Sequence, residues 1–251
     1  MFYHRKELFR PVKVGTPDAR FGQFLLEQFG GATGELKAAL QYWVQSFHVT
    51  DPGIRDMLQD IAIEEFNHLE MVGELIKLHT AKMDQTDVFA APMFAMKGIG
   101  PHLVNSAGEC WTAAYVDEGG NVVRDLRANI GAEAGARQTY EALIKCTDDA
   151  GTIETLTHLL TREVTHTNMF MKALDGMGKL DDPFFGTVAP DASVEITFNL
   201  SQGNDYRGPW NSGTLKYDAD PQPKGGMPVP AVNPDDEKAK VDGEKKVKEP
   251  A

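Results

Sequence analysis

Four polar residues recur with the same types and spacing in two parts of the chain, 98 positions apart. Each set contains a glutamate, a tyrosine seven residues later, and a Glu-x-x-His motif that begins 30 residues after the first glutamate. The sets are Glu35, Tyr42, Glu65 and His68, and Glu133, Tyr140, Glu163 and His166. Four carboxylates and two imidazoles are ligands that suit transition metals. The repeat therefore predicts one shared metal site.

Helical periodicity explains how these residues can meet. Residues three apart lie on one face of a helix, so the Glu and His of each motif project in the same direction. Both motifs interrupt apolar stripes that are typical of core-facing helices. The stripes of the two motifs contain Ile54, Leu58, Ile61, Glu65, His68, Val72 and Leu75, and Leu156, Leu159, Glu163, His166, Phe170 and Ala173. In the third helix, the stripe contains Leu126, Ile130, Glu133, Arg137, Tyr140 and Ile144. The polar residues are therefore predicted to be buried.

Burying an unpaired carboxylate costs several kcal/mol, so four of them require a compensating positive charge. Arg137 is the cationic side chain that the stripe of the third helix places nearby. One guanidinium cannot balance four carboxylates, and multivalent cations are the simpler solution. The duplicated set matches the known pattern of metal sites inside helical bundles.

The elements that position the site are four predicted helices, at about residues 16–48, 51–83, 121–148 and 152–176. Glycines at positions 30, 31 and 34 weaken the first helix locally. Residues 85–120 contain several prolines and glycines and are predicted to form a long crossover between two helical hairpins. The fold class is therefore all-α, a four-helix bundle with one long crossover.

The domain organisation follows from composition. A chain of 251 residues that is 41% hydrophobic can bury a full bundle core. We expect one bundle domain at residues 1–178 and a C-terminal extension at residues 179–251. The extension is predicted to be mostly irregular, because its last thirty or so residues are rich in Pro, Lys, Asp and Glu. A little strand is expected at residues 193–198, which alternate in polarity. This tail is either disordered or packed on a neighbouring subunit.

Charge and targeting signals limit the partners. The net charge of −12 argues against nucleic acid and anionic membranes, which both require clustered Lys and Arg. No apolar run reaches the length of a membrane span, and the N-terminus does not resemble a signal peptide. We therefore expect a cytoplasmic protein. Cys110 and Cys146 are expected to be free thiols.

Several segments resemble the manganese catalase family, which has a ferritin-like bundle. These are Gly34-Glu35 followed by Tyr42, the segments 63–70, 125–133 and 162–166 (IEEFNHLE, DLRANIGAE and REVTH), and the Gly-Pro-Trp-Asn sequence at 208–211. The resemblance spans most of residues 1 to about 215. Ferritins and rubrerythrins share the carboxylate pattern but lack the DLRANI and GPWN sequences.

The resemblance implies two manganese ions per subunit that convert hydrogen peroxide to water and dioxygen. By this likeness Glu65 bridges the metals, Glu35 and His68 complete one site, and Glu133 and His166 complete the other. Glu163 then resembles the proton-transfer carboxylate of the family. The likeness also implies a homohexamer.

Tyr42 lies two turns from Glu35 and is placed to hydrogen-bond a ligand carboxylate, which makes it a second candidate catalytic residue. Its alternative role is that of a core tyrosine with a satisfied hydroxyl group. Tyr140 is placed similarly.

Two further features concern the surroundings of the centre. Some manganese catalases have Arg immediately before the third-helix Glu, where this chain has Ala132. A second, calcium site is predicted from oxygen donors that resemble the calcium site of some family members, namely Asp56, Asp60, Asn199, Ser201 and Gly203. The alternative is an exposed helix face beside an ordinary turn.

Two other functions compete with catalase. Ligands of this kind also accept iron, so a di-iron oxidase or ferroxidase of the ferritin-like group is the nearest alternative. A non-catalytic structural protein with a vestigial centre is more remote, because all six candidate ligands and Tyr42 are present.

Overall fold

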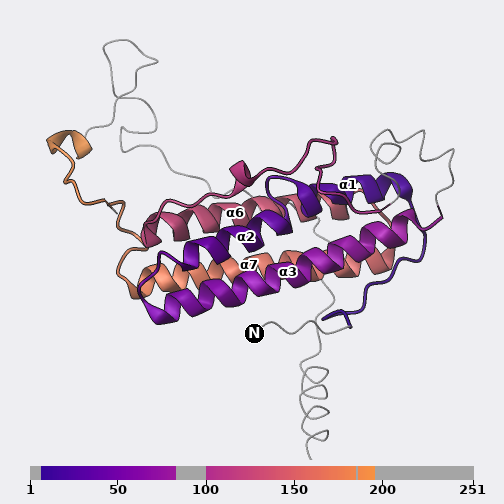
Figure 1. Ribbon diagram of the computed structural model, residues 1–251, viewed down its shortest axis with the longest axis horizontal. Helices are drawn as coiled ribbons and strands as arrows, with labels where there is room; N and C mark the ends of the chain where they lie inside the picture. The colour runs from indigo at the N-terminus through magenta and orange to yellow at the C-terminus, as the bar shows by residue number, and fades with distance from the viewer. Residues whose placement is uncertain (1–6, 83–99, 185, 196–251) are drawn as a thin grey trace, which may run out of the picture. The chain divides into compact units, whose positions relative to one another are not determined.

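A computed structural model of the chain describes residues 7–82, 100–184 and 186–195. The chain divides into two compact units, Met1–Thr187 and Val188–Ala251. The first unit contains five α-helices among its described residues: α1 (Ala19–Gly30), α2 (Glu35–Ser46), α3 (Pro52–Thr80), α6 (Val122–Ile144) and α7 (Ala150–Gly176) (Figure 1). A short 3-10 turn, η1 (Ala113–Tyr115), lies between α3 and α6.

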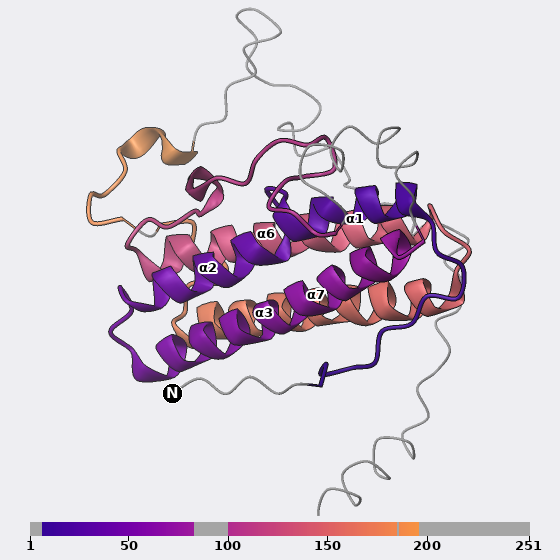
Figure 2. The ribbon, with the colours of Figure 1, turned by 45° about the vertical axis from the view of Figure 1, so that its right-hand side comes forward.

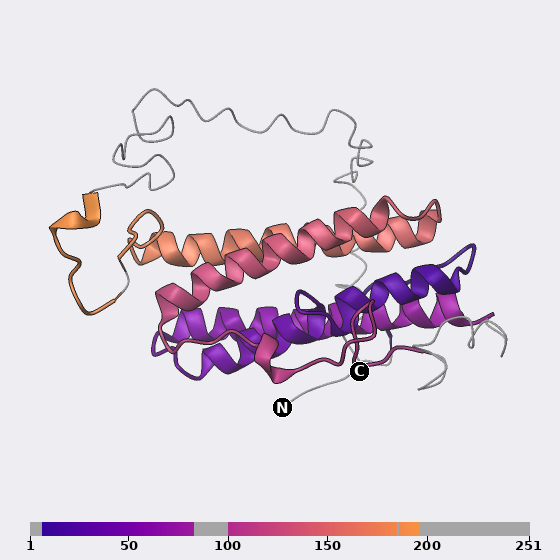
Figure 3. The same cartoon turned by 90° about the horizontal axis from the view of Figure 1, so that it is seen from above.

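The helices form two antiparallel hairpins that pack on each other. In the first, α1 and α2 follow one another along α3; in the second, α6 packs along α7 (Figures 2 and 3). Across the interface, α1 and α2 contact α6, and α3 contacts α7. Among the described residues the β-structure is limited to one isolated bridge, between Val104 and Cys110. The predicted all-α, ferritin-like bundle is confirmed.

Side-chain caps explain where most helices begin. Asp51 accepts a hydrogen bond from the Ile54 amide (2.9 Å) and is followed by Pro52, a favourable first residue of a helix. Asp18, Asn121 and Asp149 cap α1, α6 and α7 in the same way. Each cap satisfies an amide that has no partner within its helix.

The first predicted helix is in fact two helices, and this corrects the prediction of one continuous helix at residues 16–48. α1 ends at Gly30, and α2 begins at Glu35 after a short irregular segment. A Cβ atom on Gly30 would lie 2.5 Å from the Val104 carbonyl oxygen, so only glycine admits the crossover chain at this point. A Cβ on Gly34 would lie 2.8 Å from the Gln28 carbonyl oxygen. The break makes Glu35 the first residue of its helix.

The apolar core consists of two clusters that flank the predicted site. On α3, Leu58 and Ile61 belong to one cluster, and Met71 and Leu75 belong to the other. The polar residues of α3, α6 and α7 lie between the two clusters in sequence, in positions that would otherwise continue the core: Glu65, His68, Glu133, Glu163 and His166. Apolar packing at both ends therefore holds a polar layer in the middle of the bundle.

The crossover is fixed to the bundle by buried amide groups. Gln41 and Gln45 of α2 both donate to the Asn129 Oδ1 atom of α6, at 2.8 and 3.0 Å. The same glutamines bond the backbone of Asp117, which donates to Gln41 (2.9 Å) and accepts from Gln45 (2.7 Å). The Gly119 amide donates to Asp125 (2.8 Å). Two residues of the DLRANI segment thus hold the crossover in place.

Three further predictions can be compared with the structure. Arg137 was assigned to the inward stripe, which is wrong, because its side chain is 49% exposed and pairs with Glu141 on the same helix (2.7 Å). The alternation at residues 193–198 does not form a strand where it is described, since Ala192–Glu195 is a 3-10 turn, η2. Cys110 and Cys146 are free, as predicted.

No described helix is long and apolar enough to cross a membrane.

His79 joins three elements at one end of the bundle. Its Nδ1 atom accepts from the Asp18 amide (3.1 Å), so Nε2 carries the proton and donates to Thr152 Oγ1 (3.0 Å). The Thr152 hydroxyl in turn donates to Asp149 (2.8 Å). Burial lowers the pKa of His79 despite the nearby Asp149 and Asp18 carboxylates. The neutral ring therefore links the caps of α1 and α7 to α3.

Replacing His79 with Leu should lower the free energy of unfolding by about 1–3 kcal/mol, because the Asp18 amide and the Thr152 hydroxyl lose their partner. The pKa of His79 is lower in the folded protein than in the unfolded chain. The extra stability of the wild type is therefore complete above the unfolded pKa of about 6.5, and it is lost as the pH falls through the folded pKa. Urea denaturation at pH 7 and pH 5 measures both effects. His48→Leu, at an exposed histidine, is the control and should change little. Equal stability of wild type and His79→Leu at pH 7 would refute this role.

Candidate metal centre

Six buried side chains from four helices meet between the two apolar clusters. Glu35 comes from α2, Glu133 from α6, and a Glu-x-x-His pair from each of α3 and α7. Each of the six is at most 2% exposed. The predicted convergence of Glu35, Glu65, His68, Glu133, Glu163 and His166 is therefore present in the structure.

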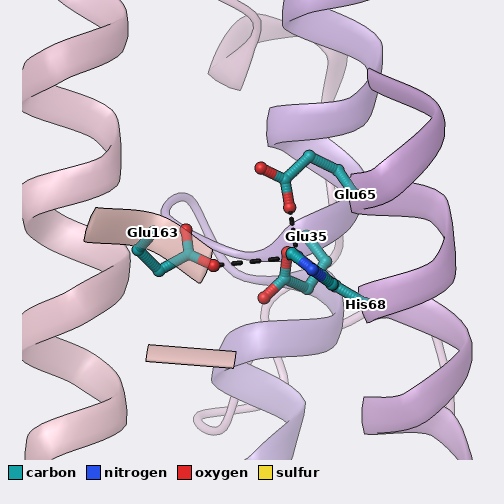
Figure 4. Close-up of side chains that lie close together, drawn as sticks. All are labelled: Glu35, Glu65, His68 and Glu163. Carbon is teal, nitrogen blue, oxygen red and sulfur yellow. Dashed lines mark hydrogen bonds and ion pairs between the residues drawn. The ribbon is translucent and has the colours of Figure 1, made fainter. Parts of the chain in front are cut away.

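The six residues form two overlapping groups, and this overlap defines the geometry of the centre. One group comprises Glu35, Glu65, His68 and Glu163, and the other comprises Glu65, Glu133, Glu163 and His166. Within each group the potential ligand atoms lie within 4.8 Å of one another. Figure 4 shows the first group, in which Glu163 reaches from its own helix towards Glu35 and His68. Glu65 and Glu163 are common to both groups, so two cation positions here would be adjacent.

The Glu65 carboxylate lies between the two imidazoles, with one oxygen directed to each. Its Oε2 atom is 2.7 Å from His68 Nδ1, and its Oε1 atom is 2.8 Å from His166 Nδ1. The two rings are nearly parallel, with an interplanar angle of 23° and centroids 5.6 Å apart. A carboxylate placed in this way can bind one metal through each oxygen. The arrangement favours the bridging position expected for Glu65.

Several polar atoms of the centre are buried without a hydrogen-bond partner, which tests whether these residues fit metal ions. They include Glu65 Oε1, Glu133 Oε2, Glu163 Oε1 and both ring nitrogens of His166. Glu65 Oε1 and His166 Nδ1 approach each other closely but without the geometry of a hydrogen bond. Leaving such atoms unsatisfied is costly. Lone pairs that converge on a common point are what a cation requires, so the donor set fits a metal pair.

The electrostatics of the centre disfavour the charged form of three of its four carboxyl groups. Burial, and then the charge of Glu65, raise the pKa of Glu35 to about 8. The same two causes raise the pKa of Glu133, and that of Glu163 is raised well above its usual value. Burial acts in the same direction on Glu65, but the adjacent His68 and His166 outweigh it and lower its pKa. Metal ions would replace the protons that otherwise neutralise these acids.

The two tyrosines of the repeat bond carboxylates of the opposite hairpin. The Tyr42 hydroxyl donates to Glu133 Oε1 (2.6 Å), and the Tyr140 hydroxyl donates to Glu35 Oε1. Tyr42 was expected to bond a ligand carboxylate; its partner is the candidate ligand Glu133, across the interface between the hairpins. Each tyrosine thereby orients one carboxylate of the centre and links the two halves of the bundle.

Three charged residues near the centre were not singled out from the sequence. Glu64 and Arg162 form an ion pair between α3 and α7, with 2.6 Å between Arg162 Nε and Glu64 Oε1. Lys37 of α2 is 7% exposed; burial lowers its pKa, while Glu133 and Asp117 oppose this. The repeat held a signal for the pair, because residues 64 and 162 are also 98 positions apart. Their opposite charges hid this correspondence.

The predicted calcium ligands are described only in part. Asp56 and Asp60 are exposed and lie one turn apart on α3. Asn199, Ser201 and Gly203 lie outside the described residues. Within the described part of the chain, neither metal-ligand group includes Asp56 or Asp60.

Two helical hairpins that surround a shared carboxylate and imidazole centre define a bundle protein with a dinuclear metal site. Comparisons with known proteins agree with this class. Residues 1–224 match the family model described as manganese containing catalase. The chain therefore belongs to the manganese-containing catalase family.

Individual relatives support the family assignment. The crystal structure of KatB, a manganese catalase from Anabaena, is 64% identical with a TM-score of 0.79, and the match covers 88% of this chain and all of that chain. A Clostridium acetobutylicum protein named "Probable manganese catalase" is 41% identical over 70% of this chain and 80% of its own length. A Bacillus subtilis manganese catalase is 31% identical over 81% and 82%.

Proposed function

We propose that this protein is a dimanganese catalase that converts two molecules of hydrogen peroxide to two of water and one of dioxygen. The observation that carries the proposal is the pair of ligand groups sharing Glu65 and Glu163 inside the bundle core. Membership of the manganese-containing catalase family supports manganese as the metal and peroxide disproportionation as the reaction. The distances around Glu65 favour two adjacent metal ions over one.

The ligands divide naturally between the two positions. Glu35 and His68 would hold one manganese ion, and Glu133 and His166 the other, while Glu65 binds both. When bound, the metal pair supplies two-electron redox chemistry, which lets one peroxide be reduced and another oxidised. Tyr42 and Tyr140 orient the terminal carboxylates Glu133 and Glu35.

Glu163 is proposed to transfer protons during the reaction. Its carboxyl group is almost completely buried, and burial together with the charge of Glu65 raises its pKa well above the usual value. A carboxyl group with a raised pKa can both donate and accept a proton, as the conversion of peroxide to water and dioxygen requires. Its carboxylate lies within 4.8 Å of candidate ligand atoms in both groups, within reach of a substrate at either metal position.

The remaining expectations stay predictions. The homohexamer, the cytoplasmic location and the calcium ion bound near Asp56 and Asp60 rest on the sequence. A di-iron oxidase remains the competing function, because these donors also accept iron. Metal identity and turnover distinguish the two.

The function is tested by loading the metal-free protein with Mn²⁺ or Fe²⁺ alone and measuring metal stoichiometry and oxygen release on the same sample. We expect two manganese ions per chain, with rapid release of one dioxygen for every two peroxides consumed. The iron-loaded sample should release far less. A protein that binds two manganese ions and leaves peroxide unchanged is not a catalase, and peroxide-driven turnover confined to iron would support the oxidase.

Replacing Glu163 with Gln should preserve both metals and lower the turnover number about 10²–10⁴-fold, because the amide cannot exchange a proton. Metal analysis and oxygen release measure the two effects separately. Glu154→Gln is a matched control, since Glu154 lies on the same helix with an exposed side chain paired to Arg10. Loss of a metal ion from Glu163→Gln would make Glu163 a ligand and contradict the proposed role.

A further inference from the structure

The ion pair between Glu64 and Arg162 lies against the outer edge of both imidazole rings. Glu64 Oε1 is 3.5 Å from His68 Nε2, and Glu64 Oε2 is 3.2 Å from His166 Nε2, where the approach lacks the geometry of a hydrogen bond. Arg162 approaches the same carboxylate through Nε (2.6 Å) and Nη2 (3.4 Å). Both side chains are about one-third exposed, whereas the two histidines are buried. One carboxylate thus lies beside both rings.

The orientation of the rings gives this contact a chemical meaning. The Nδ1 atoms of His68 and His166 face Glu65 and the interior of the centre. A neutral histidine that binds a metal through Nδ1 must carry its proton on Nε2. A carboxylate facing Nε2 favours that tautomer, fixes the plane of the ring and makes Nδ1 a stronger donor. Glu64 is the carboxylate that lies within 3.5 Å of both Nε2 atoms.

The internal repeat explains why a single carboxylate serves two histidines. Glu64 and Arg162 occupy equivalent positions, each immediately before the glutamate of a Glu-x-x-His motif. The ligand positions are identical in the two halves, but this position carries opposite charges. Glutamates at both positions would repel each other, whereas Arg162 holds the Glu64 carboxylate through two contacts.

We propose that Glu64, held by Arg162, is the shared positioning residue that fixes His68 and His166 as Nδ1 ligands of the metal pair. This inference rests on the dinuclear function proposed above. It differs from a merely structural ion pair between α3 and α7, which would contribute to stability without changing metal affinity.

The pseudo-symmetry of the repeat allows a charge exchange as the test. Glu64→Gln removes the carboxylate charge and should weaken Mn²⁺ binding about 10–100-fold, as loss of a partner of a metal-bound histidine does. Arg162→Gln should produce a smaller loss, because Glu64 remains but is less firmly held. In the double variant E64R/R162E the carboxylate moves to α7, at the equivalent position, and most of the lost affinity should return. Arg137→Gln, which breaks an exposed pair on α6, should leave affinity unchanged.

The measurements are competition with a chelator for Mn²⁺ alone, thermal unfolding of each metal-free variant, and peroxide turnover of the wild type. Wild-type Mn²⁺ affinity in Glu64→Gln would overturn the proposal. So would an E64R/R162E variant that unfolds at the wild-type temperature but binds Mn²⁺ no more tightly than the single variants. If E64R/R162E is unstable, Glu64→Asp decides: the shorter carboxylate should retain more affinity than Gln, and equal losses would count against the proposal. Wild-type protein that binds two metals without turnover would refute the catalase function and leave this test intact.

Discussion

Four carboxyl groups buried between two hairpins repel one another, and they cannot all be ionised unless positive charge lies among them. Glu65 is the member that stays ionised, because both imidazoles face it at 2.7 and 2.8 Å. Burial, and then the charge of Glu65, raise the pKa of Glu35, Glu133 and Glu163. The centre therefore consists of one strong anion surrounded by groups that hold protons until cations replace them. Metal binding and protonation are two ways to satisfy the same constraint.

The rest of the bundle makes this polar layer tolerable. Apolar clusters on both sides fix the four helices, so the acids cannot relieve their repulsion by moving towards solvent. Tyr42 and Tyr140 each come from one of these clusters and bond a carboxylate of the other hairpin. The crossover is bonded to α2 and α6 through Gln41, Gln45 and Asn129. Rigid packing around a strained electrostatic centre preorganises the ligands before any ion binds.

Features that depend on local spacing could be predicted from the sequence. The Glu-x-x-His motifs and the interrupted apolar stripes of α3 and α7 specified the fold and the six converging residues, because residues three and four apart share a helix face in any bundle. The cap at Asp51-Pro52 fixed the start of α3 for the same local reason.

Features that depend on contacts distant in sequence could not be predicted. The break before Glu35 arises because the crossover at Val104 packs against Gly30. The partner of Tyr42 lies on the other hairpin, and the position of Arg137 depends on the rotation of α6, which turns Ala136 inwards and Arg137 out. The role of Glu64 needs the structure as well, since its partners on α7 lie about a hundred residues away.

The most direct test of the central claim is anomalous X-ray diffraction at the manganese absorption edge from crystals of the manganese-loaded protein. The account predicts two anomalous peaks per chain, one on each side of the Glu65 carboxylate, with His68 and His166 bound through Nδ1 at opposite ends. A single peak, or peaks remote from Glu65 with the six side chains bonded only to each other, would contradict it.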